Sequence, residues 1–519
     1  MKIKQNIIYL LVNIFVVSSV FAADQFDLVI KNGRVMDPES KLDSVRNLGI
    51  KDGKITAITK DEISGKEYID ANGLVVAPGF VDLHSHGSPI PFSQKMHLRD
   101  GVTTPLENEV GANPVDLFYN NLKGQSRTNY GATASPMGVR ESVFNSHYKT
   151  ETGHIVRDLM DVTLDTCADM SMSSTVPNEE QIKEISVQIE EGLRQGGLGI
   201  GVPVGYMTTG TTSQETADWQ RLAAKYGVAT YLHGRFSSQM PPASGILGME
   251  EMLSSVSVYG GGLLIQHIHQ QTLSRTPMAL KMIDEARKKG VNVQAEVYPY
   301  NIGSTIVGAD YLHPSNYGPN MGHTYKDILE VATMKPLTKE RYEELVKTNP
   351  GANVLFTGIS KEGMLSALAH PTTFVGSDSM PMTVTKTGKM AIDWDIAYED
   401  VSGHPRAAGA HAKVLRLVRE TKIMPLMLAI SKMTYMPAKF LEDNGVPSMA
   451  FKGRIKVGAD ADITIFNPKT VKDNSTYKQG GLPSTGIPFV IVNGTIIVKD
   501  SKVINGIFPG KPVRNAVLK

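Results

Sequence analysis

The stretch that decides the fold of this chain is PGFVDLHSHG, residues 78–87. Apolar residues alternate there with Asp82, His84 and His86, so in a β-strand, where side chains point alternately to opposite faces, the three polar groups share one face. Two histidines near a strand end can be ordinary polar residues. Two imidazoles on one face, followed by a glycine where a parallel α/β barrel has its catalytic loops, instead indicate half of a site for zinc or a similar metal.

The central part of the chain, residues 77–440, alternates short apolar runs with longer helical patterns. This alternation is typical of βα units and predicts a parallel sheet. The clearest strand-like runs are residues 198–202, 228–233, 263–267, 291–297 and 373–378. Polar residues recur at the ends of these runs, which is where a (β/α)8 barrel gathers its active site.

Three later residues stand at such ends. His233 closes one apolar run, His267 closes another, and Asp378 ends a third within the sequence Gly-Ser-Asp-Ser. A lone buried histidine is more often structural, but the shared placement at strand ends favours metal ligands. Asp378 has two interpretations, a helix N-cap or a carboxylate that accepts a hydrogen bond from the attacking water, and both use the same residue type.

The two ends of the chain share another pattern. Residues 23–76 and 441–519 contain short β-type runs joined by hairpin turns such as Asn32-Gly33, Asp52-Gly53 and Asn493-Gly494. A module as small as the first of these buries little surface by itself. We therefore expect the two ends to form one β-sandwich beside the central domain.

Residues 1–22 are typical of a signal peptide. Lys2 and Lys4 precede an apolar run over residues 7–20, and the small residues of Val20-Phe21-Ala22 suit cleavage after Ala22. The alternative is an uncleaved anchor, but the run is short and weakly apolar for a membrane span. The mature protein is expected to be exported, periplasmic or secreted, without stable insertion in the membrane.

The composition fits a globular protein whose partners are small molecules. Hydrophobic residues make up 41% and charged residues 20%, and Lys+Arg 53 against Asp+Glu 52 gives a net charge of +1. Such a chain has no basic field for nucleic acid or anionic lipid. Cys167 is the only cysteine, so it forms no internal disulfide, and we interpret it as a buried structural residue.

Seven motifs together resemble the amidohydrolase superfamily, and within it the N-acyl-D-amino-acid deacylases, often called D-aminoacylases. They extend over nearly all of the chain that follows the predicted signal peptide. They are PGFVDLHSH (78–86), DGVTT (100–104), YPY (298–300), GSD (376–378), GHPR (403–406), KMT with PA (432–438) and KGRIKVGADAD (452–462). The first and last are typical of the superfamily, whereas YPY and HPR in this order point to the deacylase branch.

The resemblance implies a distorted (β/α)8 TIM-type barrel beside a small β-sandwich. It also implies one or two zinc ions, with another divalent metal as the alternative. His84 and His86 match the metal ligands of the first strand, His233 and His267 match the later pair, and Asp378 matches the carboxylate that acts on the water.

A second set of residues is expected near the substrate. Arg406 and the tyrosines of YPY match positions near the substrate carboxylate; the alternative for Arg406 is a structural link that ties its own loop to a neighbour. Where the family often has a lysine two residues after His267, this chain has His269. This difference argues against the family's usual contact with an acidic substrate, and so against that substrate. The candidate substrate-binding residues are Arg406, Tyr298, Tyr300, Arg235, His269 and Tyr206.

The chain departs from the better-known deacylases after DGVTT. They have a cysteine ligand there, whereas this chain reads PLENEVG over residues 105–111. Glu107 and Glu109 share one face if the strand continues, so we expect one of them to replace the cysteine as a metal ligand that can bridge two ions. We favour Glu109, which lies nearer the carboxyl end of the strand. The alternative is that both glutamates lie behind the ligands or face solvent.

The predicted activity is metal-dependent hydrolysis of a linear amide, an N-acyl-D-amino acid giving a carboxylate and a free amino acid. Zinc supplies an activated water and polarises the carbonyl, while Asp378 takes the proton of the water and returns it to the departing amine. One alternative keeps the site but cleaves a cyclic amide or a dipeptide. Another is a non-catalytic binding protein on the same fold. A serine nucleophile is not indicated, because no Gly-X-Ser-X-Gly elbow follows a strand.

Overall fold

The computed structural model describes residues 26–144 and 171–518. The expected signal peptide, residues 1–22, and Cys167 lie outside the described residues. Within the described part, no helix combines the length and the apolar character needed to cross a bilayer.

Seven strands form the main sheet of the central region, and every neighbouring pair is parallel. Helices cover one face of this sheet and the barrel interior fills the other, so nearly all of its residues are buried and its strands are continuous apolar runs. In spatial order the strands are β18 (Phe374–Val375), β13 (Val293–Val297), β12 (Gly262–Ile265), β11 (Ala229–Leu232), β10 (Gly199–Val202), β9 (Ala132–Ala134) and β8 (Glu107–Ala112).

Two further strands turn this sheet into a ring. β6 (Phe80–Asp82) pairs in parallel with β7 (Val102–Pro105), which continues almost directly into β8. On the other side, a parallel bridge joins Ser85, just after β6, to Ser379, just after β18. Within the described residues the strands therefore close into a distorted (β/α)8 barrel, and the predicted fold class is confirmed.

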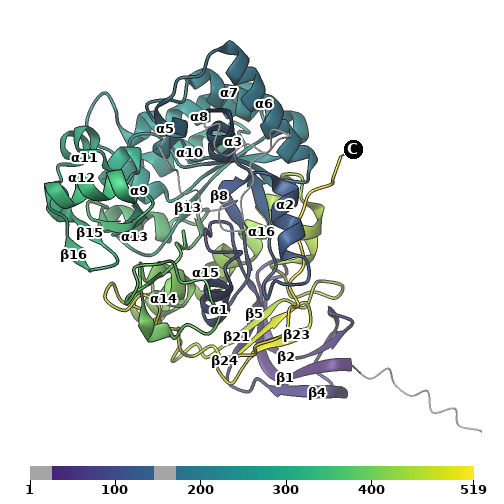
Figure 1. The fold of residues 1–519 in the computed structure, drawn as a ribbon. Helices are drawn as coiled ribbons and strands as arrows, with labels where there is room; N and C mark the ends of the chain where they lie inside the picture. The colour runs from purple at the N-terminus through teal and green to yellow at the C-terminus, as the bar shows by residue number, and fades with distance from the viewer. Residues whose placement is uncertain (1–25, 145–170, 519) are drawn as a thin grey trace, which may run out of the picture.

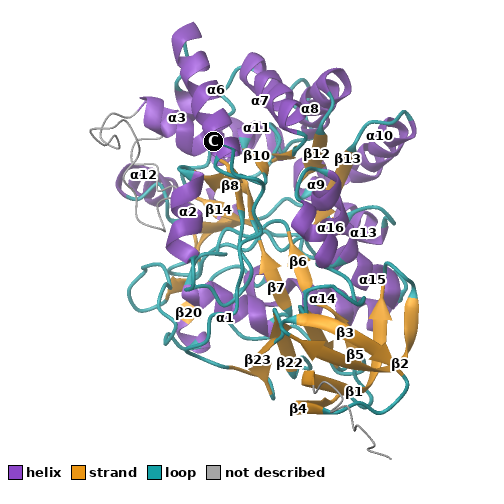
Figure 2. Ribbon diagram, turned by 90° about the vertical axis from the view of Figure 1, so that its right-hand side faces the viewer, coloured by secondary structure: helices purple, strands orange, loops and turns teal. Residues whose placement is uncertain are grey.

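Helices surround the ring, and α6, α7, α8 and α10 lie along its outside (Figures 1 and 2). Local sequence explains their ends: α7 begins with a capping box between Thr212 and Glu215 and ends at Gly227, whose φ of 66° suits glycine. The helices of this region are α1 (Pro91–Arg99), α2 (Val115–Leu122), α3 (Pro136–Phe144), α5 (Ser171–Ser174), α6 (Glu179–Arg194), α7 (Ser213–Tyr226), α8 (Gly245–Tyr259), α9 (Ile268–Thr272), α10 (Thr276–Lys288), α13 (Lys361–Ala369), α14 (Arg406–Thr421), α15 (Leu426–Met433) and α16 (Tyr435–Asp443).

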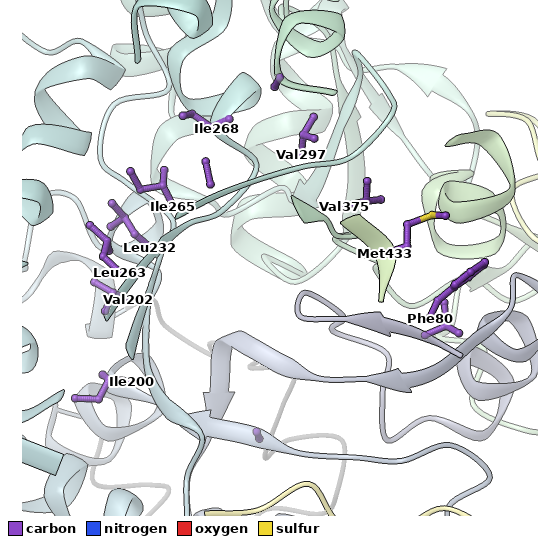
Figure 3. Close-up of a cluster of buried hydrophobic side chains, with 14 of the residues drawn as sticks. Phe80, Ile200, Val202, Leu232, Leu263, Ile265, Ile268, Val297, Val375 and Met433 are labelled. Carbon is purple, nitrogen blue, oxygen red and sulfur yellow. The ribbon is translucent and has the colours of Figure 1, made fainter. Parts of the chain in front are cut away.

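Alternate residues of the barrel strands pack in two apolar layers. Ile200 and Leu263 belong to one cluster (Figure 3). Trp219 of α7 is part of the same cluster, which lies between the sheet and the outer helices. Tyr231 and Leu264 belong to a separate cluster with residues of β6, β18 and α16, and this cluster fills the barrel interior. Apolar side chains thus fill the barrel interior, and the polar groups of the site lie at the carboxyl ends of the strands.

An insertion between β13 and β18 builds a small lobe over these ends. Its four antiparallel strands, in the order β14 (Gly303–Ile306), β17 (Asn353–Phe356), β15 (Ile328–Glu330) and β16 (Lys335–Pro336), are accompanied by α11 (Pro314–Met321) and α12 (Lys339–Thr348). Its apolar cluster includes the first and last residues of the YPY motif. A hairpin-like pair, β19 (Thr383–Val384) and β20 (Val401–Ser402), follows β18.

The two ends of the chain meet in one nine-stranded sheet, where purple and yellow strands lie side by side (Figure 1). β21 pairs antiparallel with β5, and β5 leads directly into β6, so this sheet adjoins the barrel. Its order is β24 (Lys502–Val503), β23 (Thr495–Lys499), β22 (Phe489–Val492), β21 (Ile463–Phe466), β5 (Val75–Pro78), β1 (Phe26–Asp37), β2 (Leu42–Lys51) and β3 (Lys54–Thr59), and β4 (Gly65–Asp70) also pairs with β1.

The last residues leave this sheet and return to the barrel. The Val513 amide donates to the Tyr130 carbonyl at 2.7 Å, and the Asn515 amide donates to the Gly196 carbonyl at 3.1 Å. The expected domain boundaries at residues 76 and 441 remain a prediction.

Candidate metal centre

Six polar side chains meet at the carboxyl ends of the barrel strands. Each stands in or just after a different strand, except for the two histidines after β6, and all are buried. They are His84 and His86 after β6, Glu109 in β8, His233 after β11, His267 after β12 and Asp378 after β18.

Four of them form a first donor group. Nε2 of His86 lies 3.2 Å from Oε2 of Glu109, and Nε2 of both histidines lies 3.4 Å from Oδ1 of Asp378. Nε2 of His84 also contacts Oε2 of Glu109. One nitrogen or oxygen from each residue therefore points to a common place, as the ligands of one metal ion would.

The other carboxylate oxygen of Glu109 belongs to a second donor group. Oε1 contacts Nδ1 of His233 and lies 3.6 Å from Nε2 of His267. The two imidazole nitrogens are 3.1 Å apart. Glu109 is thus shared between two groups that could each hold a metal ion, at the position where the sequence predicted a bridging carboxylate.

Two further carboxylates orient the first pair of histidines. Nδ1 of His84 lies 2.8 Å from Oε1 of Glu296, and Nδ1 of His86 lies 3.2 Å from both oxygens of Glu107. An Nδ1–H donated to a carboxylate leaves the Nε2 lone pair free for a metal, which is the usual arrangement around metal-bound histidine. Glu107, predicted as a candidate ligand, lies outside both donor groups and contacts His86 from behind.

The charges in this cluster favour a bound cation. Burial lowers the pKa of His84, but Glu296, Asp378 and Glu109 outweigh it and hold this pKa well above its ordinary value. Burial raises the pKa of Glu109, but His84 and His233 outweigh it and hold this pKa well below its ordinary value. Buried carboxylates that stay ionised need positive charge close by. Protons on the imidazoles can supply it, and a divalent cation can replace them.

The Asp378 carboxylate lies between the first donor group and Arg406. Its backbone has a φ of 51°, in the left-handed region that aspartate tolerates better than most residues, and its amide donates to the His84 carbonyl at 2.9 Å. Oδ1 lies 2.8 Å from Nη2 of Arg406. Burial raises the pKa of Asp378, but Arg406 and His84 outweigh it, so the pKa lies below its ordinary value and the carboxylate is ionised at neutral pH.

Arg406 keeps unused donors in this site. Besides Asp378, its Nη2 donates to the Ser304 carbonyl at 3.1 Å, and its guanidinium lies 4.6 Å from the ring centroid of Tyr298. Nε and Nη1 are buried and have no hydrogen-bond partner among the described residues. Nε and Nη1 therefore keep N–H groups that can donate to the carboxylate oxygens of a substrate.

Two tyrosines from the predicted set line the same site. The Tyr298 hydroxyl donates to Oε1 of Gln270 at 2.8 Å, and its ring packs on His269 with centroids 4.3 Å apart. Tyr206, in the turn η2 (Val204–Tyr206), packs on His233 at 4.8 Å. The Tyr206 hydroxyl accepts a hydrogen bond from Thr305 at 3.1 Å, which leaves its own proton to donate.

The structure gives two other predicted residues different surroundings. All the guanidinium nitrogens of Arg235 are used in structural contacts, to Glu251 and to the Thr208 and Thr211 carbonyls. Tyr300 turns from the donor groups toward Lys413, whose Nζ lies 3.4 Å from its ring centroid. Past the end of a strand, side chains two residues apart need not point the same way. Closeness in sequence to His233 and to Tyr298 was therefore not enough to predict the contacts of Arg235 and of Tyr300.

His269 is fully buried beside the site. Its Nε2 donates to the Tyr300 carbonyl at 3.2 Å, and Nδ1 has no partner among the residues that the structure describes. Burial, with a smaller effect of His267, lowers the pKa of His269 to about 3. His269 is therefore neutral and does not supply the positive charge of the lysine that the family often has there.

No family model matches the chain. Two enzymes from Alcaligenes xylosoxydans xylosoxydans are similar to it: an N-acyl-D-glutamate deacylase, 26% identical over 91% of this chain and 94% of the relative, and a D-aminoacylase, 24% identical over 90% and 94%. A dihydroorotase from Streptococcus pneumoniae is 23% identical over 91% of this chain and 99% of its own length.

The fold comparison agrees. A crystal structure of N-acyl-D-glutamate deacylase from Bordetella bronchiseptica, complexed with zinc and a phosphonate inhibitor, superposes with a TM-score of 0.74 at 22% identity, over 95% of this chain and all of the other. In sequence and in fold the chain is similar to N-acyl-D-glutamate deacylase and to D-aminoacylase. The predicted resemblance is thereby confirmed, including the similarity to the deacylase branch.

One part of this site was missed by sequence reasoning. Glu296 lies within the apolar run 291–297, two residues before the YPY motif, and was interpreted only as part of a strand. The available signal was its place near the strand's carboxyl end, on the inward face that alternation assigns to it. It contacts His84 and, through the His267 amide at 3.4 Å, the second donor group as well.

Proposed function

We propose that this protein is a metal-dependent hydrolase that cleaves the amide of an N-acyl amino acid, in the first place an N-acyl-D-amino acid, to a carboxylate and a free amino acid. The observation that carries this proposal is the position of Arg406. Its guanidinium lies 2.8 Å from the Asp378 carboxylate, and its buried Nε and Nη1 have no partner among the described residues. An N-acyl amino acid has a carboxylate one carbon away from the scissile nitrogen, so the same substrate can reach both residues.

The residues fit one or two divalent ions, and we propose zinc. His84, His86, Glu109 and Asp378 would hold one ion, and Glu109, His233 and His267 would hold the other. Imidazole and carboxylate ligands suit zinc but also manganese or cobalt. Such an ion lowers the pKa of water toward 7 and polarises a carbonyl.

The chain's own residues supply proton transfer and orientation. The ionised Asp378 takes a proton from the water whose oxygen attacks the acyl carbon, and it gives this proton to the nitrogen when the C–N bond breaks. Arg406 binds the substrate carboxylate and fixes the nitrogen near Asp378. Tyr206 can donate its free hydroxyl proton to the acyl oxygen, since burial, together with nearby Tyr311 and carboxylates, raises its pKa well above the ordinary value.

The charges around the site favour a substrate with a single carboxylate. Among the described residues beside the donor groups, Arg406 has free N–H donors, whereas Arg235 is saturated and Lys413 lies over the Tyr300 ring. His269 is neutral. A second carboxylate, as in N-acyl-D-glutamate, would therefore lack a cation, and we propose a neutral amino-acid side chain.

A substrate panel tests this function. Protein loaded with zinc is assayed for release of amino acid from N-acetyl derivatives of D- and L-methionine, D- and L-leucine, D-glutamate and D-aspartate. We expect turnover of the neutral D-compounds and at least tenfold lower kcat/KM for the acidic ones. Equal rates for acidic and neutral compounds would contradict the charge argument, and no turnover of any compound would contradict the proposed function.

A second candidate is hydrolysis of a cyclic amide, which the similarity to a dihydroorotase favours. A ring amide with a carboxylate beside it could use Arg406 and Asp378 in the same way. Dihydroorotate and 5-substituted hydantoins, assayed under the same conditions, separate the two candidates. A kcat/KM for a ring substrate above that for every N-acyl amino acid would favour this second function over a deacylase.

We also propose that the protein is exported after cleavage at Ala22. The support is the order of a charged start, an apolar run and small residues at positions 20 and 22. N-terminal sequencing of protein from the periplasmic fraction tests this. A mature chain that begins at Ala23 is expected, and full-length protein confined to the cytoplasm would contradict it.

A further inference from the structure

Three buried polar side chains meet directly beside the first donor group. Oγ of Ser85 and Oγ of Ser379 are 2.9 Å apart, and Nε2 of His97 lies 2.9 Å from the latter and 3.3 Å from the former. Their exposed fractions are 0%, 1% and 2% for Ser85, Ser379 and His97, so water does not replace these contacts. We call these three residues the serine–histidine cluster.

The cluster joins the two segments that carry the first donor group. Ser85 stands between His84 and His86, and Ser379 follows Asp378. The backbones of the two serines form a parallel bridge, and the His86 amide donates to the Ser379 carbonyl at 2.9 Å. Any shift of one serine therefore moves a donor of the first group relative to the other segment.

His97 connects this junction to a helix. It lies in the last turn of α1, whose residues are largely buried. Burial, together with nearby His411, lowers the pKa of His97 to about 3, so the ring is neutral and Nε2 either accepts from or donates to the hydroxyls. In both cases a single nitrogen faces both serines, and Nδ1 has no partner within the described part of the chain.

Stability alone does not account for these groups. Replacing both partners of a buried hydrogen bond by apolar groups of the same shape costs little, so a packed apolar junction would serve the fold equally well. Directed hydrogen bonds do add a fixed orientation. Asp378 needs a fixed orientation for two reasons. Its positive φ is held only by neighbouring groups. An error of about 1 Å in the position of a reacting group can also lower the rate about a hundredfold.

We propose that His97 is a positioning residue: through Ser85 and Ser379 it fixes Asp378 relative to His84 and His86. This inference rests on the proposed function insofar as Asp378 is the base. It assigns no contact between His97 and substrate. His97 acts through the two hydroxyls alone.

Three variants and one control test the proposal. His97→Leu removes the ring nitrogen while filling the space, Ser379→Ala removes the central hydroxyl without adding bulk, and His97→Gln puts an amide near the position of Nε2. The control is His411→Gln, because His411 is also fully buried, also on a helix, and bonded through Nδ1 to Asp100 at 3.1 Å instead of to the serines.

The readouts are kcat and KM separately, and the visible absorption spectrum of protein loaded with cobalt in place of zinc, which reports ligand geometry without turnover. We expect His97→Leu and Ser379→Ala to lower kcat about 10- to 100-fold, with KM changed less than about threefold, and to alter the cobalt spectrum. His97→Gln is expected to recover at least part of kcat. The His411→Gln control is expected to keep both the spectrum and kcat.

Two outcomes overturn the proposal. If folded His97→Leu and Ser379→Ala proteins keep the kcat and cobalt spectrum of the unchanged protein, the cluster only contributes to packing. If His411→Gln alters kcat and spectrum as much as His97→Leu, the effect is a general one of buried histidines. A failure of the proposed function looks different: the unchanged protein would hydrolyse no amide, while the cobalt spectra would still report whether His97 positions the donor group.

Discussion

Replacing Glu109 by glutamine tests whether this carboxylate is shared between two metal ions. Oε2 of Glu109 lies 3.2 Å from Nε2 of His86, and Oε1 lies 3.6 Å from Nε2 of His267. Glutamine keeps the size of the side chain but has one carbonyl oxygen and no charge. It can serve one donor group at most, so the first group falls from four donors to three or the second from three to two.

The loss of the Glu109 negative charge sets the expected loss of metal affinity. Two unit charges about 4 Å apart at an effective dielectric constant of about 20 interact by about 4 kcal/mol, which is roughly a thousandfold in an equilibrium constant. We therefore expect Glu109→Gln to bind one tight ion fewer than the unchanged protein and to hold any remaining ion at least about a hundredfold more weakly. Elemental analysis after dialysis and competition with a coloured chelator measure stoichiometry and affinity.

Glu107 provides the matched control on the same strand. It contacts His86 at Nδ1 and lies outside both donor groups. Groups that orient a ligand from behind typically contribute about 10- to 100-fold to metal affinity. Glu107→Gln should thus weaken binding without changing the number of ions. The reasoning is refuted if Glu109→Gln keeps the full number of tightly bound ions while Glu107→Gln loses one.

Four further predictions follow from the site. Asp378→Asn should lower kcat at least about a hundredfold while circular dichroism stays unchanged, and near-normal turnover would exclude Asp378 as the base. Arg406→Lys should lower kcat/KM for N-acyl amino acids roughly 10- to 100-fold and spare the corresponding amides; unchanged discrimination between acid and amide would contradict its role. Arg235→Gln should lower the free energy of unfolding by about 3 kcal/mol in denaturant titrations with KM unchanged, and a raised KM would return Arg235 to the substrate site. Although burial lowers the pKa of His84 and of His86, neighbouring carboxylates raise each pKa well above 6.5, so the metal-free histidines bind protons that a metal must displace. Zinc affinity should therefore fall as the pH is lowered from above 6.5. Calorimetry in buffers of different ionisation enthalpy measures the protons that zinc binding releases. An affinity that does not change with pH would contradict this prediction.

The sequence could predict which side chains meet, because one geometric rule covers them. The carboxyl ends of parallel strands meet at one end of a barrel, so polar residues that end separate apolar runs must come together there. His233 and His267 are 34 residues apart in sequence, yet their ring nitrogens are 3.1 Å apart. The choice of Glu109 over Glu107 as the group nearer the strand end agrees with its position between the two donor groups.

The same rule does not say where side chains point once a strand has ended. Arg235 follows His233 by two residues but turns to Glu251 of α8, and Tyr300 turns away from the Arg406 that Tyr298 contacts. These directions depend on loop backbone and on partners distant in sequence.

Other features depend on tertiary contacts without a local signature. Glu296 looks like any polar residue in an apolar run until the fold brings His84 within 2.8 Å of it. His97 lies in a helix between the first two barrel strands. Its positioning role is indicated only by its contact with Ser379, which is 282 residues away. The four-stranded lobe inserted after β13 was also not predicted, because its strands are short and pair out of sequence order.

We expect Glu109 to join two metal sites at the carboxyl ends of the barrel strands. The most direct measurement is an anomalous difference map from a crystal of the metal-loaded protein, collected at the metal's absorption edge. We expect one peak among His84, His86, Glu109 and Asp378. Any second peak is expected among Glu109, His233 and His267, with the Glu109 carboxylate between the two. A metal peak with no Glu109 oxygen within about 2.5 Å would contradict it.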